Sequence, residues 1–463
     1  ACSNLSIGIA NKPHMRPRVY VLRFRAKGTL MTAVTPPSDR FTPIAFAMIA
    51  GLLLVRLILV WVSPLDLYAD EAQYWRWGQT LEWGYYSKPP MVAWMIHAST
   101  GLFGESEWAI RILAPVFHAI AAAVLFLLAR RMFGSLAGLF CVVTYVLMPG
   151  IILSSGVIST DGVLFPFWCI ALYLFWRLRE EDLGWIGAVG LGIAIGCGFL
   201  SKYAMLYFAI GIALTWLIDA PTRKAVLAPI GLTALAVAAL VFAPHLILNV
   251  AIEFKSVSHT VDNANLGGEL FNLDHFPRFL GDQMGVFGPI CFIALLAGLT
   301  FIRPKTVLAD LGDAPHAQRA KENWLACFIV PVLIIIAFQA VLSRAHANWA
   351  ATAYPAACVF LGGFLMRARS WRWAYWGGIG LQIVIGVFAI TLALAPPSWS
   401  AAVGRDNDYK RVRGWDDLSE QLAREIERVQ PTAVLVDERE IWHGLDYYLK
   451  DTLDVPLILW RYN

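Results

Sequence analysis

The chain has 463 residues, of which 58% are hydrophobic and only 15% are charged, and its formal net charge is +4 at pH 7. Soluble globular proteins have about 25% charged residues, so the composition excludes a soluble enzyme, a coiled coil and a disordered chain, and the charge does not favour a nucleic-acid partner. The aromatic content of 13%, with 19 Trp, is typical of proteins that place rings at membrane interfaces.

The chain begins with a basic segment, residues 1–40, that has no sustained apolar period. We expect this segment to be disordered, and we expect Met31 to be the natural start because the apolar sequence begins soon after it. No cleavable signal peptide is apparent, because the run from Phe41 to Val62 is long enough to span a bilayer.

A membrane domain is predicted over residues 41–396. A helix needs about 20 apolar residues to cross the bilayer, and runs of this kind predict about eleven transmembrane helices. Their approximate ranges are 41–62, 109–129, 135–153, 163–178, 184–201, 203–219, 225–248, 284–302, 323–342, 350–366 and 373–396. The predicted fold class is therefore an all-α polytopic membrane protein.

The orientation follows from the basic residues between the spans. With the N-terminus in the cytoplasm, every cytoplasmic connection contains Lys or Arg, for example Arg130, Arg179 and Lys224. Basic residues are retained in cytoplasmic loops, so we expect a multi-pass protein of the bacterial inner membrane. The other connections and the C-terminus are then periplasmic.

The first predicted periplasmic loop, residues 63–108, is rich in charged and aromatic side chains. Asp70 and Glu71 open a helix-forming stretch that should lie in the headgroup plane, and the helix dipole should keep Asp70 ionised at neutral pH. Lys88 and two prolines then break the chain, and a second amphipathic helix precedes Arg111. The alternative is an ordinary interfacial loop whose acids only cap a helix.

More polar side chains stand at span ends on the same side. Asp161 lies in a tight turn between two spans, Lys202 interrupts two apolar runs, and His346 and Asn348 share a later turn. Ionisable groups at membrane depth are costly and are functional candidates. Each also has a structural alternative, since Asp161 could cap a helix, Lys202 could snorkel and His346 could be a hydrogen-bonded turn residue. Because all share one bilayer level, we predict that they gather with Asp70.

The tail, residues 397–463, has a different character from the spans. The sequences GWDDLSEQLAREIERV and EIWHGLDYYLK have a helical period, and TAVLVDE and PLILW are typical of strands. We predict a small periplasmic α/β domain. It is too small for a large core of its own, so it should dock on the membrane domain.

These motifs, in this order, resemble those of the GT-C glycosyltransferases. The shared features are the Asp70-Glu71 pair, the Lys88-Pro-Pro break, the TDG turn that contains Asp161 and the SKY segment that contains Lys202. The chain is most similar to protein O-mannosyltransferases (family 39) and lipid A aminoarabinose transferases (family 83), over residues 41 to 400. The resemblance implies a glycosyltransferase with a polyprenyl-phosphate sugar donor and an envelope acceptor, such as lipid A, the lipopolysaccharide core or another glycan.

The resemblance also implies roles for individual residues. Asp70 matches the acid that acts as general base, and Asp161 matches the second acidic position. Lys88 matches the lysine near the donor phosphate and Lys202 a further cationic position, to which we add Arg111 as a candidate phosphate ligand. The candidates for the substrate pocket are Glu71, Tyr74, Tyr85, Tyr86, His346 and Asn348.

The chemistry of glycosyl transfer requires the same residue types. A carboxylate must take the acceptor proton, cations must stabilise the departing phosphate, and an amphipathic groove must admit the isoprenoid tail. One departure from the aminoarabinose transferases is Gln73, where they commonly carry Arg, and this weakens any assignment of aminoarabinose as the sugar. The sequence requires no cofactor, although Asp70, Glu71 and His346 could hold a divalent metal.

A second class of function is left open. A polytopic transporter or flippase for a lipid-linked or anionic substrate would also place charges within a membrane domain. It would spread those charges through the bilayer depth and break its helices near their centres, whereas the charges here concentrate at one face.

Overall fold

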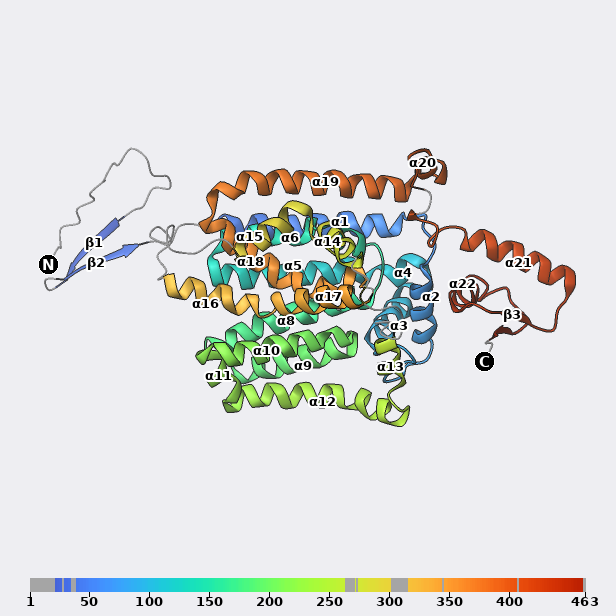
Figure 1. Ribbon diagram of the computed structural model, residues 1–463, viewed down its shortest axis with the longest axis horizontal. Helices are drawn as coiled ribbons and strands as arrows, with labels where there is room; N and C mark the ends of the chain where they lie inside the picture. The colour runs from blue at the N-terminus through green and yellow to red at the C-terminus, as the bar shows by residue number, and fades with distance from the viewer. Residues whose placement is uncertain are drawn as a thin grey trace, which may run out of the picture.

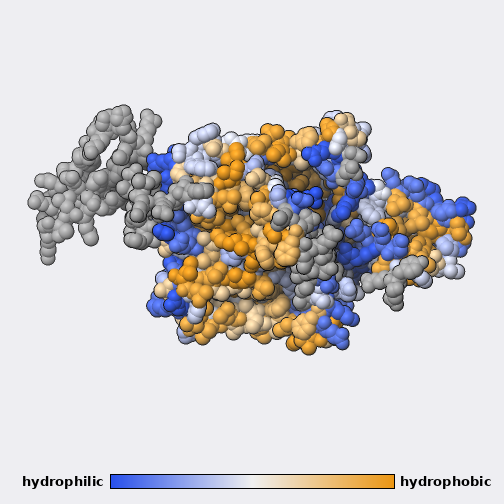
Figure 2. Space-filling model, in the orientation of Figure 1, coloured by the Kyte–Doolittle hydropathy of each residue, from blue (hydrophilic) through white to orange (hydrophobic). Residues whose placement is uncertain are grey.

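The structure is a computed structural model that describes residues 21–26, 29–34, 39–262, 271, 274–300, 315–343, 345–405 and 408–460. Long helices run side by side along the long axis of the molecule (Figure 1). In the face shown in Figure 2, apolar residues cover the middle of the bundle and hydrophilic residues concentrate towards its two ends. The middle of the bundle therefore suits hydrocarbon and its ends suit water.

Seven helical segments within the described residues are long and apolar enough to cross a membrane. They are α1 (Phe41–Trp61), α4 with α5 (Glu107–Arg111 and Leu113–Phe133), α8 (Thr160–Arg179), α12 (Pro229–Ala251), α16 with α17 (Pro315–Ala326 and Val330–Leu342), η3 with α18 (Ala347–Ala353 and Tyr354–Arg367) and η4 with α19 (Arg369–Trp371 and Arg372–Leu394). The number rises to nine if two bent pairs each count as one span. These pairs are η1 (Tyr203–Met205) and α10 (Leu206–Ile218) with α11 (Ala220–Leu227), and α14 (His275–Phe287) with α15 (Pro289–Thr300). The prediction of a helical multi-pass membrane protein is confirmed.

The expected count of eleven is not reached by length and composition alone. The other two expected spans correspond to α6 (Ser135–Leu147) and α9 (Trp185–Ser201), which have 13 and 17 residues. At about 1.5 Å per residue, α6 is about 20 Å long, whereas the hydrocarbon core is about 30 Å thick. It ends early because Pro149 restricts the preceding residue to an extended conformation, and a separate helix, α7 (Pro149–Ser154), follows.

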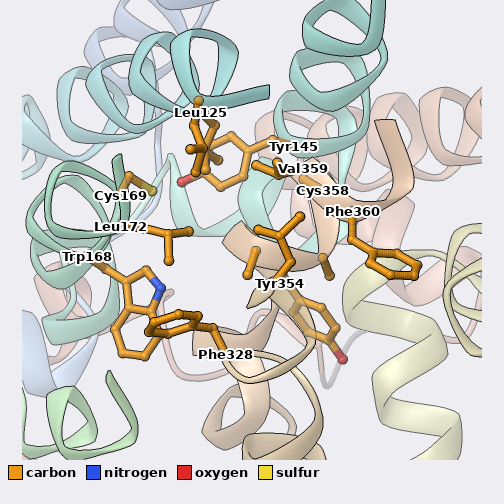
Figure 3. Packing of buried hydrophobic residues seen from close by; sticks show 14 of the residues in the cluster. Leu125, Tyr145, Trp168, Cys169, Leu172, Phe328, Tyr354, Cys358, Val359 and Phe360 are labelled. Atoms are coloured by element: carbon orange, nitrogen blue, oxygen red, sulfur yellow. The ribbon is translucent and has the colours of Figure 1, made fainter. Parts of the chain in front are cut away.

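Helix α18 forms the centre of the bundle and packs against α5, α6 and α15. Figure 3 shows side chains of α5, α6, α8 and α18, among them Tyr145, Trp168 and Val359, packed in one apolar cluster. The approach of α18 to α6 depends on Gly362, because a Cβ atom there would lie 2.5 Å from the carbonyl oxygen of Ala137. Of the candidate residues, Asp161 lies in the first turn of α8 and Asn348 lies in η3, directly before α18.

Shorter helices gather at one end of the bundle, which we call the α2 end. They include α2 (Ala69–Gly78), α3 (Met91–Phe103) and α13 (Lys255–Asp262), and the C-terminal elements lie at the same end (Figure 1). Helix α20 (Pro397–Ala402) leads from α19 into the C-terminal elements. The two helices predicted in the first loop are therefore present, one on each side of the Lys88 break.

The C-terminal elements are α21 (Trp415–Val429), β3 (Val434–Val436), α22 (Arg439–Tyr448) and β4 (Leu457–Leu459), and the two strands are parallel. Helix α22 packs on α2, where the Tyr447 ring meets the Trp75 ring edge to face at 5.0 Å. The Tyr447 hydroxyl donates to the carbonyl oxygen of Glu105 at 2.8 Å, and the Tyr448 hydroxyl accepts from the backbone N–H of Leu67 at 2.7 Å. Helix α22 is therefore held firmly against the segment that carries Asp70.

The N-terminal segment differs in part from the expectation of disorder. Strands β1 (Val21–Ala26) and β2 (Thr29–Val34) pair antiparallel, at the end of the molecule opposite α2 (Figure 1). In β1, Arg23 and Arg25 alternate with apolar residues, a period-two pattern typical of strands that a search for long apolar runs passes over. Residues 1–20, on which much of this expectation falls, lie outside the described residues.

Candidate active site

Helix α2 begins at a capping arrangement built by Glu71. The Glu71 carboxylate accepts from the backbone N–H of Tyr68 at 3.0 Å, which is the reciprocal contact of a capping box. It also accepts from the backbone N–H of Ile158, just before α8, at 2.9 Å. Because the side chain is 0% exposed, Glu71 joins the first loop to the start of α8 and does not line a pocket.

Arg111 is the ion-pair partner of Glu71. Its Nη2 lies 2.7 Å from Oε2 of Glu71, and its Nη1 donates to the carbonyl oxygen of Leu65 at 2.7 Å. The Arg111 residue is 2% exposed. The interpretation of Glu71 as a pocket residue and of Arg111 as a phosphate ligand is therefore corrected, since the two charges satisfy each other beneath the surface and hold the first loop in place.

Asp161 lies in the first turn of α8, a helix that Ser159 caps by accepting from the backbone N–H of Gly162 at 3.2 Å. Both Asp161 carboxylate oxygens lie 2.7 Å from Nζ of Lys202, which ends α9. Nδ2 of Asn348, which comes from η3, donates to Oδ2 of the same carboxylate at 2.8 Å. The structure thus brings together three predicted residues from three separate segments.

Asp70 and Lys88 come from the first loop. The Asp70 side chain is 45% exposed, and its Oδ1 lies 3.8 Å from Nη2 of Arg439 in α22. The Lys88 side chain is partly buried, and within the described part of the chain its ammonium forms no hydrogen bond and no ion pair. Lys88 is therefore a cation at the site that remains available to a ligand.

Charge interactions connect Asp70 and Lys88 with Asp161 and Lys202. Burial lowers the pKa of Lys88 below its ordinary value; the positive charge of Lys202 acts in the same direction, and the carboxylates of Asp70 and Asp161 oppose it. Burial also raises the pKa of Tyr74 well above its ordinary value, and both carboxylates add to that rise. The charges of Asp70, Asp161 and Lys202 therefore all affect Lys88.

The pKa of Asp70 is shifted by the same surroundings. Burial raises it above 3.8, and the positive charges of Arg439 and Lys88 oppose that rise without cancelling it. A carboxylate with a raised pKa is a stronger base than an ordinary aspartate, and it stays ionised at neutral pH only while that pKa remains below 7.

A cavity of about 320 Å³ reaches Asp161. Its polar lining includes Ser159, Asp161 and Asn348 at the start of α8 and in η3, whereas most of its other walls are apolar. The apolar residues include Met148, Ile151, Leu153, Val157, Phe165, Val286 and Ala351. A cavity with one polar region and apolar walls suits an amphipathic ligand.

The remaining pocket candidates have different surroundings. Tyr85 is 6% exposed, stacks on the Trp77 ring at 4.9 Å and directs its hydroxyl at the carbonyl oxygens of Trp77 and Thr80. It therefore braces the first loop, which corrects its assignment to the pocket. Tyr86 is 56% exposed, and the exposed His346 packs edge to face on a tryptophan in η3.

Arg439 is the site residue that the sequence did not reveal. In addition to its contact with Asp70, its Nη1 donates to Oε1 of Gln73 at 3.1 Å. The predicted docking of the tail and the departure at Gln73 were the two available signals, but neither identifies the arginine. No group of three or more His, Cys, Asp or Glu side chains that could hold a metal ion occurs among the residues that the structure describes.

The chain is similar to several known proteins. Residues 87–248, which include Lys88, Asp161 and Lys202, match the family described as dolichyl-phosphate-mannose-protein mannosyltransferase. Lipid A galacturonosyltransferase RgtD of Rhizobium johnstonii is 34% identical over 410 residues, which cover 87% of this chain and 82% of RgtD. The undecaprenyl phosphate-alpha-4-amino-4-deoxy-L-arabinose arabinosyl transferase of Pseudomonas aeruginosa is 31% identical over 176 residues, which cover 33% of this chain and 31% of that protein.

The fold has a solved counterpart. The crystal structure of ArnT from Cupriavidus metallidurans bound to undecaprenyl phosphate is similar over 90% of this chain and 86% of ArnT, with a TM-score of 0.62 at 15% identity. The extent of the similarity to RgtD, together with this shared fold, establishes the family. The chain belongs to the GT-C membrane glycosyltransferases, in the branch that contains the lipid A glycosyltransferases.

Proposed function

We propose that this protein transfers a sugar from a polyprenyl-phosphate donor to lipid A, or to another part of the lipopolysaccharide, at the periplasmic face of the inner membrane. RgtD is named as a lipid A galacturonosyltransferase, and the ArnT structure holds undecaprenyl phosphate. The observation that carries the proposal is the gathering of Asp70, Lys88, Asp161 and Lys202 at the α2 end, with an amphipathic cavity at Asp161.

Lys88 is the group that we assign to the donor phosphate. Lys202 is engaged with both oxygens of Asp161, whereas the Lys88 ammonium has no such partner within the described residues. A charge-assisted hydrogen bond to a phosphate oxygen becomes stronger as negative charge develops on the leaving group. The apolar walls of the cavity would accept the first isoprene units of the donor.

Asp70 is the group that we assign as general base. Its carboxylate is half-exposed, whereas the carboxylate of Asp161 is held by Lys202 and Asn348. In the reaction, the acceptor oxygen forms a bond to the anomeric carbon, the bond from that carbon to the phosphate oxygen breaks, and the acceptor proton passes to Asp70. Asp161 would position Lys202 and Asn348 around the donor.

The orientation is part of the same proposal. The basic residues Arg130, Arg179 and Arg223 lie at or just beyond the ends of α5, α8 and α10, and the positive-inside rule favours placing them in the cytoplasm. The α2 end and the C-terminal α/β elements would then face the periplasm. We also infer that α6 and α9 are short spans, which would bring the total to eleven.

A reconstitution assay tests the proposed function. The purified protein is placed in lipid vesicles with a polyprenyl-phosphate sugar and lipid A, and released polyprenyl phosphate and glycosylated lipid A are followed by mass spectrometry. Formation of both products in equal amounts supports the proposal. Movement of the intact donor across the bilayer without cleavage would favour a flippase, and the absence of both products would overturn the proposed transfer.

A further inference from the structure

A buried histidine in α12 contacts the segment that leads to Lys88. The His245 residue is 0% exposed, and its Nδ1 lies 2.6 Å from the carbonyl oxygen of Trp83. A carbonyl oxygen can only accept, so Nδ1 donates in this bond. A Cβ atom on Gly84 would lie 2.6 Å from the same nitrogen, so this close packing requires glycine. Polar side chains buried in membrane-spanning helices are costly and are functional candidates.

The second ring nitrogen of His245 belongs to a polar network beside Lys202. Its Nε2 lies 2.9 Å from the hydroxyl of Tyr203 and 3.0 Å from Nδ2 of Asn249. Ser256 in α13 completes the network, since its Oγ lies 2.5 Å from the Tyr203 hydroxyl and donates to Oδ1 of Asn249. Because an amide nitrogen only donates, Nε2 accepts, and the bonds at both ring nitrogens together determine the orientation of the ring.

Short stretches of chain connect these contacts with the two lysines. The backbone N–H of Tyr85 donates to the carbonyl oxygen of Lys88 at 3.0 Å and closes a tight turn that begins directly after Gly84. On the other side of the ring, Tyr203 directly follows Lys202. The imidazole therefore lies between the segment that carries Lys88 and the segment that carries Lys202.

The Lys88 ammonium needs such support. Burial and the positive charge of Lys202 both disfavour its charged form, and the carboxylates of Asp70 and Asp161 offset only part of this effect. A cation that is disfavoured in this way stays at the site only if its loop is held there. A preorganised cation needs no rearrangement when negative charge develops on the leaving group, provided that the residues around it are rigid.

We propose that His245 is a positioning residue that holds the Lys88 turn beside Lys202, where the donor phosphate would bind. This inference rests on the proposed function and adds a residue to that site. His245 itself would not contact the donor, because both ring nitrogens are occupied by the protein. Its effect on binding would therefore depend on Lys88.

A double-variant cycle on ligand affinity tests this dependence. Undecaprenyl phosphate is titrated into the purified protein in detergent, and its Kd is measured for the wild type, Lys88→Met, His245→Leu and the double variant. Lys88→Met should weaken binding roughly 10- to 100-fold, because a hydrogen bond between charged groups is lost. His245→Leu should weaken binding about 10-fold, and Lys88→Met should then add little in that background, since the effects of coupled residues do not add.

Further variants separate positioning from a general loss of structure. His245→Asn keeps a donor towards Trp83 and should recover part of the affinity. Size-exclusion chromatography shows whether each variant folds. If His245→Leu does not fold, Tyr203→Phe takes its place in the cycle, because it removes only one hydroxyl of the network. The matched control is Tyr375→Phe, which removes a buried hydroxyl near the start of α19 that contacts Thr144, and it should bind as the wild type.

The outcomes distinguish this inference from the proposed function. Wild-type affinity in the His245 or Tyr203 variant used for the cycle, or losses that multiply with that of Lys88→Met, would overturn the positioning role. Wild-type affinity in Lys88→Met would overturn it as well. If the wild-type protein binds undecaprenyl phosphate but transfers no sugar in the reconstitution assay, the proposed function fails, and the cycle still decides the role of His245.

Discussion

The buried pair of Glu71 and Arg111 yields a sharp prediction for the substitution Glu71→Gln. The substitution keeps the size of the side chain but removes the negative charge that Arg111 faces at 2.7 Å. It also replaces one carboxylate oxygen, which accepts hydrogen bonds, with an NH₂ group, which donates them. The backbone N–H groups of Tyr68 and Ile158 and the Arg111 guanidinium all donate to this carboxylate, so the NH₂ group would face another donor. The variant should therefore be destabilised.

The magnitude follows from burial. The side chains of Glu71 and Arg111 are 0% and 3% exposed, so neither charge can be solvated when its partner is removed. Breaking a buried ion pair by removing one partner costs about 3–5 kcal/mol. A double variant, Glu71→Leu with Arg111→Met, removes both charges and should recover much of this loss, because an apolar pair of similar volume is often as stable as a buried ion pair.

Thermal aggregation in detergent, followed by size-exclusion chromatography, measures this effect. Glu71→Gln should aggregate at a clearly lower temperature than the wild type, and the double variant should lie between them or near the wild type. Below that temperature, Glu71→Gln should retain transfer activity. Wild-type stability together with lost transfer would contradict a structural role and would place Glu71 in the catalytic machinery.

Three further predictions concern the chemistry. Asp70→Asn should leave folding intact and lower kcat by about 10²–10⁴-fold in the reconstitution assay; near-normal turnover would exclude Asp70 as the base. The base must be ionised, and burial raises the pKa of Asp70, so the loss of kcat/KM on acidification should begin at a higher pH than for an ordinary aspartate. Arg439→Gln removes a positive charge that lowers this pKa and should therefore move this loss of kcat/KM to a still higher pH. A move to lower pH in the variant would contradict the assignment of Asp70 as the base. Dialysis against EDTA should leave the transfer rate unchanged, because Lys88 would supply the positive charge at the phosphate; a loss that Mg²⁺ or Mn²⁺ restores would show that a metal takes part.

The part of the site that could be predicted is the part that the bilayer determines. Asp161, Lys202 and Asn348 lie at span ends, and alternation of the chain across the membrane places such ends at one level. Their separation along the chain is therefore no obstacle, and the structure joins them through hydrogen bonds. The helices and strands of the tail were likewise visible in their residue periods.

What could not be predicted depends on tertiary pairing. A buried ion pair and a catalytic pair use the same residue types, so the sequence could not separate Glu71 and Arg111 from the site. Arg439 lies 366 residues beyond Gln73, and no periodicity links them. The early end of α6 was missed because Pro149 is surrounded by apolar residues, so an apolar scan continues through it.

We propose that the donor phosphate binds at Lys88, with its isoprenoid chain in the cavity beside Asp161. An electron cryomicroscopy structure of the protein in a lipid nanodisc with bound undecaprenyl phosphate tests this most directly. We expect a phosphate oxygen within hydrogen-bond distance of Lys88 Nζ and lipid density along Phe165 and Val286. Phosphate density at the opposite end of the bundle, or at the α2 end without contact to Lys88, would contradict it.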